Sequence, residues 1–175
     1  MPGDGNHRSR GGAEGKEEMN CCESQTFPDG VQRTDATCVG VSCRDQGHPV
    51  TLRTMLLMLK PEFFDQVGDR QYRFCASPDC SVVYFSHDRC FTTGDLRVRV
   101  GLKEKDDPIP LCYCLGLSEE DARQEIAVNG STTICNRIKS LLKEGMCTCE
   151  ESNPSGACCL RDVARAVKRL MQETR

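Results

Sequence analysis

The sequence predicts an α+β fold made of two small units joined by a connector, and three observations lead to this prediction. Two Cys-x4-Cys pairs, within residues 38–43 and 75–80, flank helical and β-prone segments. Two further cysteine-rich segments, 112–114 and 147–159, enclose amphipathic helical patterns. Between these halves, residues 103–110 are charged and then broken by prolines, a composition that suits a connector rather than a helix or strand.

The composition of the chain favours a reducing compartment. Its 175 residues include 14 cysteines, and units of this size commonly need a metal or disulfides to be stable. Residues 1–20 hold no apolar core of a secretory signal, and the longest apolar run, 55–59, is too short to insert in a membrane. We therefore expect a cytoplasmic protein whose cysteines bind metal. The net charge of −3 gives no basis for nucleic-acid binding.

Residues 1–36 are rich in glycine and in polar and charged side chains, and they carry few large apolar ones. Burial of so few apolar groups cannot offset the entropy lost on ordering, so we expect a disordered N-terminal tail. The adjacent Cys21 and Cys22 lie in this tail. We favour incidental exposed thiols over a metal-capturing pair for these two residues.

The first folded unit is expected over residues 37–102. Thr51 can cap a helix whose apolar positions recur at helical spacing up to Leu59, and Pro61 stops it. Gly68 then turns the chain toward the β-prone segments.

Strands are predicted in the second part of this unit. The β-prone runs 71–74 and 81–85 form a hairpin with the second cysteine pair in its turn. Residues 96–100 alternate apolar side chains with arginines, which predicts another strand packed on the hairpin. Residues 87–90, which include His87 and Cys90, are interpreted as a surface turn with a half-buried thiol rather than a metal site.

The two Cys-x4-Cys pairs have the layout of a closed four-thiolate zinc site, although the usual spacing is Cys-x2-Cys. Zinc is favoured over four unlinked thiols, because a structural metal compensates for a small core. The predicted zinc ligands are Cys38, Cys43, Cys75 and Cys80.

The second unit, residues 111–175, is predicted to be helical. One helix is expected over 118–129, with a serine cap and acidic residues in its first turn, and another over 131–144. A last helix begins near Cys158 and carries an apolar face opposite a basic one. Cys135, beside the apolar stripe of the second helix, is interpreted as a core thiol.

The remaining thiols point to an iron-sulfur cluster. Cys-x-Cys and Cys-Cys neighbours rarely reach the geometry of a disulfide, whereas a [2Fe-2S] cluster takes four thiolates as two separated pairs. Adjacent helical residues project about 100° apart, so only one of Cys158 and Cys159 can be a ligand. Spacing alone does not decide between Cys147 and Cys149.

These motifs, taken in this order, resemble those of a known protein family. Residues 74–85, Cys112-Tyr113-Cys114 and the run 153–159 (Asn-Pro-Ser-Gly-Ala-Cys-Cys) together resemble the N-terminal region of the CopZ copper chaperone family, over roughly residues 38–172. The second half also resembles bacterioferritin-associated ferredoxin-like [2Fe-2S] domains.

The resemblance implies a zinc-binding α+β domain followed by a helical [2Fe-2S] domain. It matches the zinc site to the four cysteines above and makes Cys147 and Cys158 non-ligands. The family continues into a copper-carrying domain with a Met-x-Cys-x2-Cys loop, a motif that this sequence lacks. The implied cluster ligands are Cys112, Cys114, Cys149 and Cys159.

We therefore expect single-electron transfer linked to copper or other thiophilic metal homeostasis, with reduction of Cu(II) before transfer of Cu(I) as one use. The expected partner is a redox protein or a copper- or metal-handling protein. The alternative is a metal or redox sensor or adaptor in which cluster and zinc are structural or regulatory. A third possibility, disulfides or zinc without iron, is the least favoured. A conventional enzyme is not expected, because the sequence presents no acid-base pair, phosphate loop or nucleophile with a positioned base.

Overall fold

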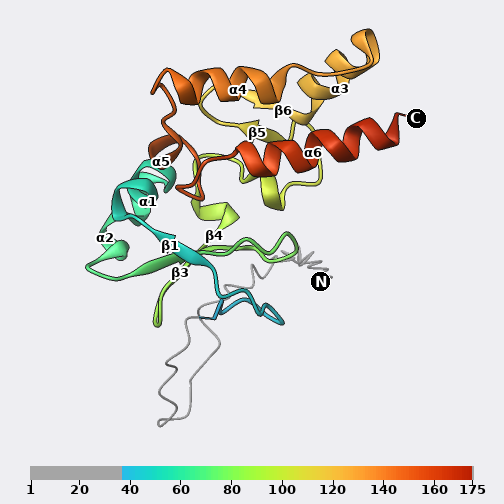
Figure 1. Ribbon diagram of the computed structural model, residues 1–175. Coiled ribbons are helices and arrows are strands. Elements are labelled where there is room, and N and C mark those ends of the chain that lie inside the picture. Colours follow the sequence, from blue (N-terminus) through green and yellow to red (C-terminus); the bar gives the residue numbers. More distant parts are fainter. Residues whose placement is uncertain (1–36, 175) are drawn as a thin grey trace, which may run out of the picture.

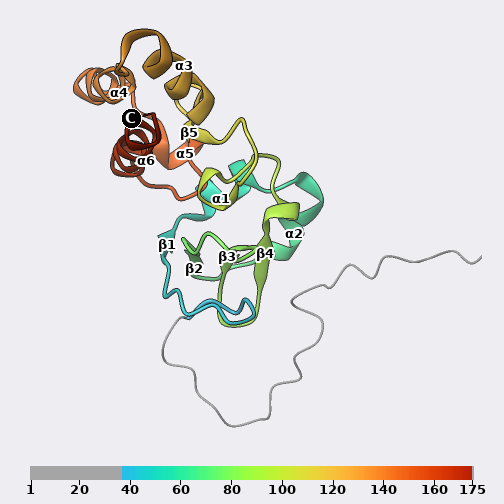
Figure 2. The ribbon, with the colours of Figure 1, turned by 90° about the vertical axis from the view of Figure 1, so that its right-hand side faces the viewer.

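The computed structural model describes residues 37–174, so Cys21 and Cys22 lie outside the described part of the chain. In both views a small antiparallel sheet with short helices occupies one side, and the longer helices of the second half gather on the other (Figure 1, Figure 2). Mixed α and β structure was expected, and the described residues show it. Within residues 37–174 no helix is long and apolar enough to cross a membrane.

The first half forms a four-stranded antiparallel sheet in the order β1-β2-β3-β4. Strands β2 and β3 pair with Phe74 opposite Tyr84, which confirms the predicted hairpin. The elements are β1 (His48–Val50), α1 (Leu52–Met58), α2 (Phe64–Val67), β2 (Tyr72–Phe74), β3 (Val82–Phe85) and β4 (Cys90–Thr92).

The first helix begins where the sequence predicts. The Thr51 hydroxyl accepts a hydrogen bond from the Thr54 backbone N–H at 3.1 Å, which satisfies one of the free donors at the start of α1. Helix α1 ends at Met58, and Pro61 starts a short 3-10 turn, Pro61–Phe63, before α2. Gly68 has a φ of 59°, which favours glycine at this turn.

The predicted strand at residues 96–100 is wrong, because the last strand of the sheet is β4. The Arg97 backbone N–H donates to the Met58 carbonyl, and Leu96 makes an isolated bridge with Leu59, so this segment binds the end of α1 instead of the sheet edge. Two of its alternating apolar side chains, Leu96 and Val100, are nevertheless buried, and Val98 is half-buried. Cys90 is also buried, at the start of β4, rather than half-exposed in a turn.

The second half contains a two-stranded sheet and four helices among the described residues. These elements are β5 (Pro110–Cys112), β6 (Leu117–Ser118), α3 (Glu119–Asn129), α4 (Ile134–Lys143), α5 (Cys149–Ser152) and α6 (Leu160–Glu173). The capping box predicted for α3 is present: Ser118 Oγ accepts from the Asp121 N–H, and the Asp121 carboxylate accepts from the Ser118 N–H.

Helix α4 begins at Ile134, three residues later than predicted. The Glu125 carboxylate of α3 accepts hydrogen bonds of 2.7 Å from the Thr132 hydroxyl and from the Thr133 backbone N–H. These bonds hold residues 131–133 as a turn between α3 and α4.

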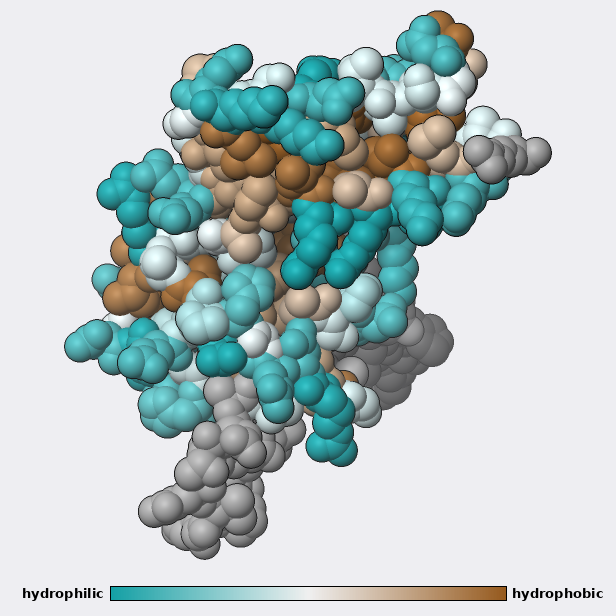
Figure 3. All heavy atoms as spheres, viewed as in Figure 1, coloured by the Kyte–Doolittle hydropathy of each residue, from teal (hydrophilic) through white to brown (hydrophobic). Residues whose placement is uncertain are grey.

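Each half has its own buried core. In the first, aromatic side chains of β2, β3 and β4 pack on Met55 of α1 and on Leu59, which follows the helix. In the second, Ile134 and Ile138 of α4 pack with Val163 and Leu170 of α6. Hydrophobic surface gathers between α4 and α6 and hydrophilic side chains cover the outer side of α4 (Figure 3).

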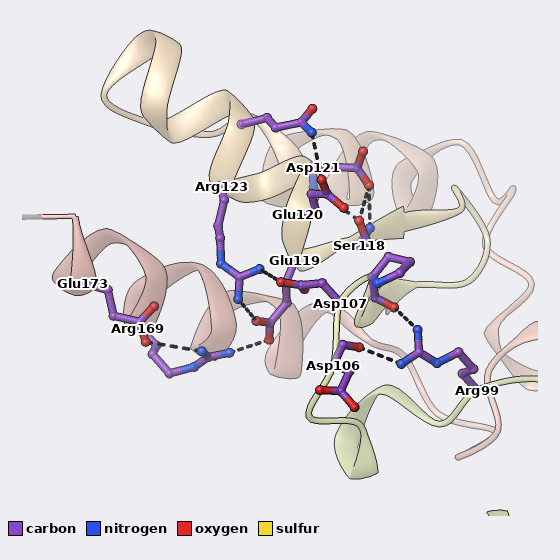
Figure 4. Close-up of polar contacts among 12 residues, drawn as sticks. Arg99, Asp106, Asp107, Ser118, Glu119, Glu120, Asp121, Arg123, Arg169 and Glu173 are labelled. Carbon is purple, nitrogen blue, oxygen red and sulfur yellow. Dashed lines mark hydrogen bonds and ion pairs between the residues drawn. The ribbon is translucent and has the colours of Figure 1, made fainter.

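The predicted connector is held by ion pairs on its α3 side. Arg123 of α3 contacts both Asp107 and Glu119, and Glu119 also binds Arg169 of α6 (Figure 4). Glu119 is buried, so two guanidinium groups compensate the cost of burying its charge. On the other side, Arg99 donates to the Pro108 carbonyl. Residues 103–110 therefore join the two halves as a fixed segment.

Candidate metal centres

The structure brings together the four thiols that the sequence predicts as zinc ligands. Their Sγ atoms all lie within 4.8 Å of one another. Two separations are 3.8 Å, between Cys38 and Cys80, and 3.7 Å, between Cys43 and Cys75. Four sulfurs about 2.3 Å from a tetrahedral zinc ion are about 3.8 Å apart. The donor set therefore fits zinc in both chemistry and spacing.

A tight turn presents the first cysteine pair to this group. The Cys43 N–H donates to the Gly40 carbonyl at 3.0 Å, which closes the turn. A Cβ atom added to Gly40 would lie 2.4 Å from the Cys80 sulfur. Glycine is therefore required here because the hairpin thiol approaches the backbone of the turn.

Polar groups outside the four thiols fix the hairpin turn. The Asp45 carboxylate accepts from the Gly47 N–H at 2.7 Å and from the Ala76 N–H. Burial opposes ionisation of Asp45, but these backbone donors outweigh it and lower its pKa. Lys103 donates to the carbonyls of Ser77 and Cys80, which places a positive charge beside a site that becomes anionic when four thiolates bind zinc.

The thiols of this group differ in acidity. A hydrogen bond from the Cys38 thiol lowers the pKa of Cys75 to about 6, so Cys75 is a thiolate at neutral pH. Burial raises the pKa of Cys80 to about 11. Hydrogen bonding to Cys75 and burial raise the pKa of Cys38 as well. One thiolate is thus ready for a metal, and Cys38 and Cys80 must release protons when they bind.

A second group of thiols forms where the end of β5 meets α5 and the start of α6. The Sγ atoms of Cys114, Cys147 and Cys149 lie within 4.8 Å of one another, and the Cys114–Cys149 separation is 3.7 Å. The Cys159 thiol lies close enough to Cys112 and Cys149 to lower the pKa of both. The four predicted cluster ligands therefore meet at one place, and Cys147 joins them there.

These interactions set the acidity of the second group. Interaction with the Cys159 thiol is the main cause that lowers the pKa of Cys112 to about 6 and that of Cys149 to about 5. The same interactions raise the pKa of Cys159. Burial raises the pKa of Cys147 to about 12. Two thiolates are therefore available at neutral pH inside a largely apolar cluster.

Helix α6 begins at Leu160, two residues later than expected, so the adjacent Cys158 and Cys159 precede it. They differ in burial: Cys159 is 3% exposed and lies with the second group, whereas Cys158 is exposed. The spacing in the sequence left Cys147 and Cys149 as alternatives, and the structure places both thiols in the group. The fold of the turn at residues 147–149 brings the Cys147 thiol beside Cys114. Cys135 packs against the core of the second half, as expected.

Tyr113 fixes the direction of the Cys-Tyr-Cys segment. Its hydroxyl donates to the Arg99 carbonyl and accepts from the Gly101 N–H, both at 2.9 Å. Strand β5 ends at Cys112, and the anchored Tyr113 opens the turn that carries Cys114.

Side chains of the first half hold the loop that precedes Cys159. Thr54 donates to the Glu150 carbonyl at 2.6 Å, Tyr84 donates to the Pro154 carbonyl at 2.7 Å and His48 bonds the Ser155 carbonyl at 2.8 Å. Helix α1 packs on α5 in the same region. The first half therefore positions the loop between two of the predicted cluster ligands.

This arrangement predicts that Tyr84→Phe loosens the loop. The Tyr84 side chain is fully buried, so the substitution leaves the Pro154 carbonyl without its donor, at a cost of about 1–3 kcal/mol. Tyr72→Phe is the matched control, because the buried Tyr72 hydroxyl donates to the Val67 carbonyl within the first half. Hydrogen-exchange mass spectrometry should show faster exchange over residues 150–159 in Tyr84→Phe alone. Equal protection of this segment in both variants would contradict the role given to Tyr84.

Known proteins resemble this chain over most of the described residues. Residues 36–97 match the CopZ-type family described as a zinc-binding domain. The copper chaperone CopZ of Archaeoglobus fulgidus is 31% identical over 121 residues, which cover 67% of this chain and 55% of that protein. The chain thus spans about half the length of this curated relative.

A solved structure extends the likeness to the fold. The X-ray structure of the Archaeoglobus fulgidus CopZ N-terminal domain superposes with a TM-score of 0.59 at 29% identity. The match covers 74% of this chain and 95% of the solved chain. The similarity therefore includes residues beyond the zinc-binding match.

Proposed function

Residues 36–97 are a CopZ-type zinc-binding domain, and from this premise we propose that the chain is a metal-homeostasis protein with a structural zinc ion and a [2Fe-2S] cluster. Zinc is assigned to Cys38, Cys43, Cys75 and Cys80. The cluster is assigned to Cys112, Cys114, Cys149 and Cys159. We infer that the protein works in the reducing cytoplasm, which keeps these thiols available.

The observation that carries the proposal is the meeting of the second group of thiols inside a hydrophobic core. Cys112, Cys149 and Cys159 are all at most 5% exposed. Eleven cysteines within residues 37–174 are reduced, including all those assigned to the two centres. A buried thiolate is stable only beside a positive charge. The two irons of a [2Fe-2S] cluster would supply that charge to four thiolates, which arrive as two cysteine pairs.

The chemistry of the bound cluster would be one-electron transfer. The protein residues supply its environment: the apolar core excludes water, and Thr148 and Ser152 place hydroxyls 3.5 and 3.2 Å from the Cys114 sulfur. Proteins set the reduction potential of such clusters through hydrogen bonds to the ligating sulfurs and through exclusion of solvent.

A cleft of about 690 Å³ between the two halves reaches this centre, because Cys159 forms part of its wall. Its lining also includes Tyr113 and charged side chains of both signs, among them Glu104 and Arg165. We propose that a redox or metal-handling protein approaches the cluster at this cleft. By likeness to the copper chaperone, the physiological metal would be copper or another thiophilic ion, with Cu(II) reduction as one use.

Anaerobic purification with metal analysis tests the proposal. We expect about two iron atoms and one zinc ion per chain, with charge-transfer absorption that bleaches on addition of dithionite and returns on reoxidation. Reversible reduction supports electron transfer, whereas loss of the cluster on reduction supports the sensor or adaptor alternative. A folded, zinc-loaded protein that stays colourless after iron-sulfur reconstitution would overturn the cluster assignment.

A further inference from the structure

Three thiols at the surface side of the second group form a triangle. Cys114 is followed by the rest of the β5–β6 turn, whereas Cys147 and Cys149 flank Thr148 where α5 begins. Their Sγ atoms lie within 4.8 Å of one another, and one side of the triangle measures 3.7 Å. Three sulfurs about 2.3 Å from a central ion in a trigonal plane are about 4 Å apart. Small side-chain adjustments would therefore suffice to bind one ion.

We propose that, in the cluster-free protein, Cys114, Cys147 and Cys149 form a three-thiolate site for one soft metal ion such as Cu(I). This site uses Cys147, which has no role in the proposed cluster. It leaves Cys112 and Cys159 unused.

The ligand number favours a soft ion of low coordination. Zinc requires four ligands in a structural site, and the first half of the chain already offers it four thiols. Thiolates select soft ions, and Cu(I) is stable with two or three of them. Within residues 37–174 no other cysteine, histidine or carboxylate joins this triangle at the same spacing.

The surroundings suit an anionic site. The Thr148 hydroxyl donates to the Cys114 sulfur at 3.5 Å, and the Ser152 hydroxyl lies 3.2 Å from the same atom. The Ser152 hydroxyl donates to the Thr148 carbonyl and lies 3.3 Å from the Thr148 hydroxyl, so the two hydroxyls stay together beside the Cys114 sulfur. Hydrogen bonds from hydroxyls stabilise thiolates and orient them, as outer contacts do in other metal sites.

The triangle is more accessible than the zinc group. Cys114 and Cys147 are half-buried, whereas three of the four thiols of the zinc group are buried. An ion bound here could be exchanged with a partner without unfolding the protein. The site shares Cys114 and Cys149 with the cluster of the proposed function, so if that proposal holds, cluster and single ion exclude each other.

The experiment is an anaerobic Cu(I) titration of the full chain, isolated without iron and with zinc in place. Cys21→Ser and Cys22→Ser are introduced throughout, because these adjacent thiols would compete for Cu(I). Affinity is measured against a chromophoric Cu(I) chelator, and zinc is quantified to show that the first site is intact. We expect one Cu(I) per chain, with three sulfur ligands by X-ray absorption.

Two variants separate the triangle from the cluster ligands. Cys147→Ser should lower the Cu(I) affinity more than about tenfold, since even outer-contact losses cost tenfold or more at metal sites. Cys112→Ser should leave it within about twofold. Cys135→Ser, a half-buried thiol outside the triangle, controls for general loss of a cysteine. Equal losses in Cys147→Ser and Cys112→Ser, or none in Cys147→Ser, would overturn the proposal. The titration needs no iron, so its outcome is independent of the cluster assignment.

Discussion

Cys75→Ser is expected to abolish zinc binding and to unfold the first half of the chain. Cys75 is completely buried between β2 and the hairpin turn, and hydrogen bonding with Cys38 lowers the pKa of its thiol to about 6. Serine supplies a poor zinc ligand at this position. Structural zinc contributes about 10–16 kcal/mol to the folding of small zinc-dependent peptides. A core of this size alone rarely supplies more than about 3–5 kcal/mol.

Zinc content by mass spectrometry and unfolding followed by circular dichroism would check this prediction. Chelation of the wild-type protein should reproduce the effect of the substitution, because both remove the same bonds. Cys135→Ser is the matched control: its thiol packs against the other core, so zinc should be retained and stability should change by about 1 kcal/mol. A Cys75→Ser protein with one zinc ion and an unchanged unfolding midpoint would refute the structural role of zinc.

The second large effect is expected for Cys149→Ser, which should remove the charge-transfer absorption of the proposed cluster completely. Cys149 is buried, its sulfur lies 3.7 Å from that of Cys114, and interaction with the Cys159 thiol lowers its pKa to about 5. Its thiol therefore contacts members of both predicted cysteine pairs. Loss of one thiolate leaves an iron without its second protein sulfur.

Cys147→Ser is the informative control for this experiment, because Cys147 is two residues away and lies in the same group of thiols. Iron content and the visible spectrum should stay close to those of the wild-type protein in Cys147→Ser and in Cys158→Ser. The reverse pattern, with the spectrum lost in Cys147→Ser and kept in Cys149→Ser, would exchange their roles. A spectrum retained in both single variants would mean that either thiol can serve.

Short-range signals in the sequence predicted much of the fold. The Thr51 cap, the hairpin around residues 75–80 and the Ser118 capping box are all present, because each depends on neighbouring residues and backbone donors. The strand predicted at residues 96–100 is wrong. Their alternation reports burial of one side of an extended chain, and it does not say whether a sheet partner is in reach.

Contacts between residues far apart in the sequence were harder to predict. Spacing indicated which cysteines could act together, but it left Cys147 and Cys149 as alternatives, because their positions depend on how the segment around α5 packs on α1. The hydrogen bonds from Thr54 and Tyr84 to residues 150–154 join the two halves of the chain. Such bonds could not be predicted, because they produce no periodic pattern in the sequence. The ligand assignments themselves stay predictions until the metals are measured.

The bonds from Thr54, Tyr84 and His48 to the loop before Cys159 imply an order of maturation. These three donors stand on α1, β3 and β1, which take up their places only when the zinc unit has folded. A newly made chain would therefore acquire zinc first and accept iron and sulfide afterwards. Cells starved of zinc would accumulate colourless protein even when iron is plentiful.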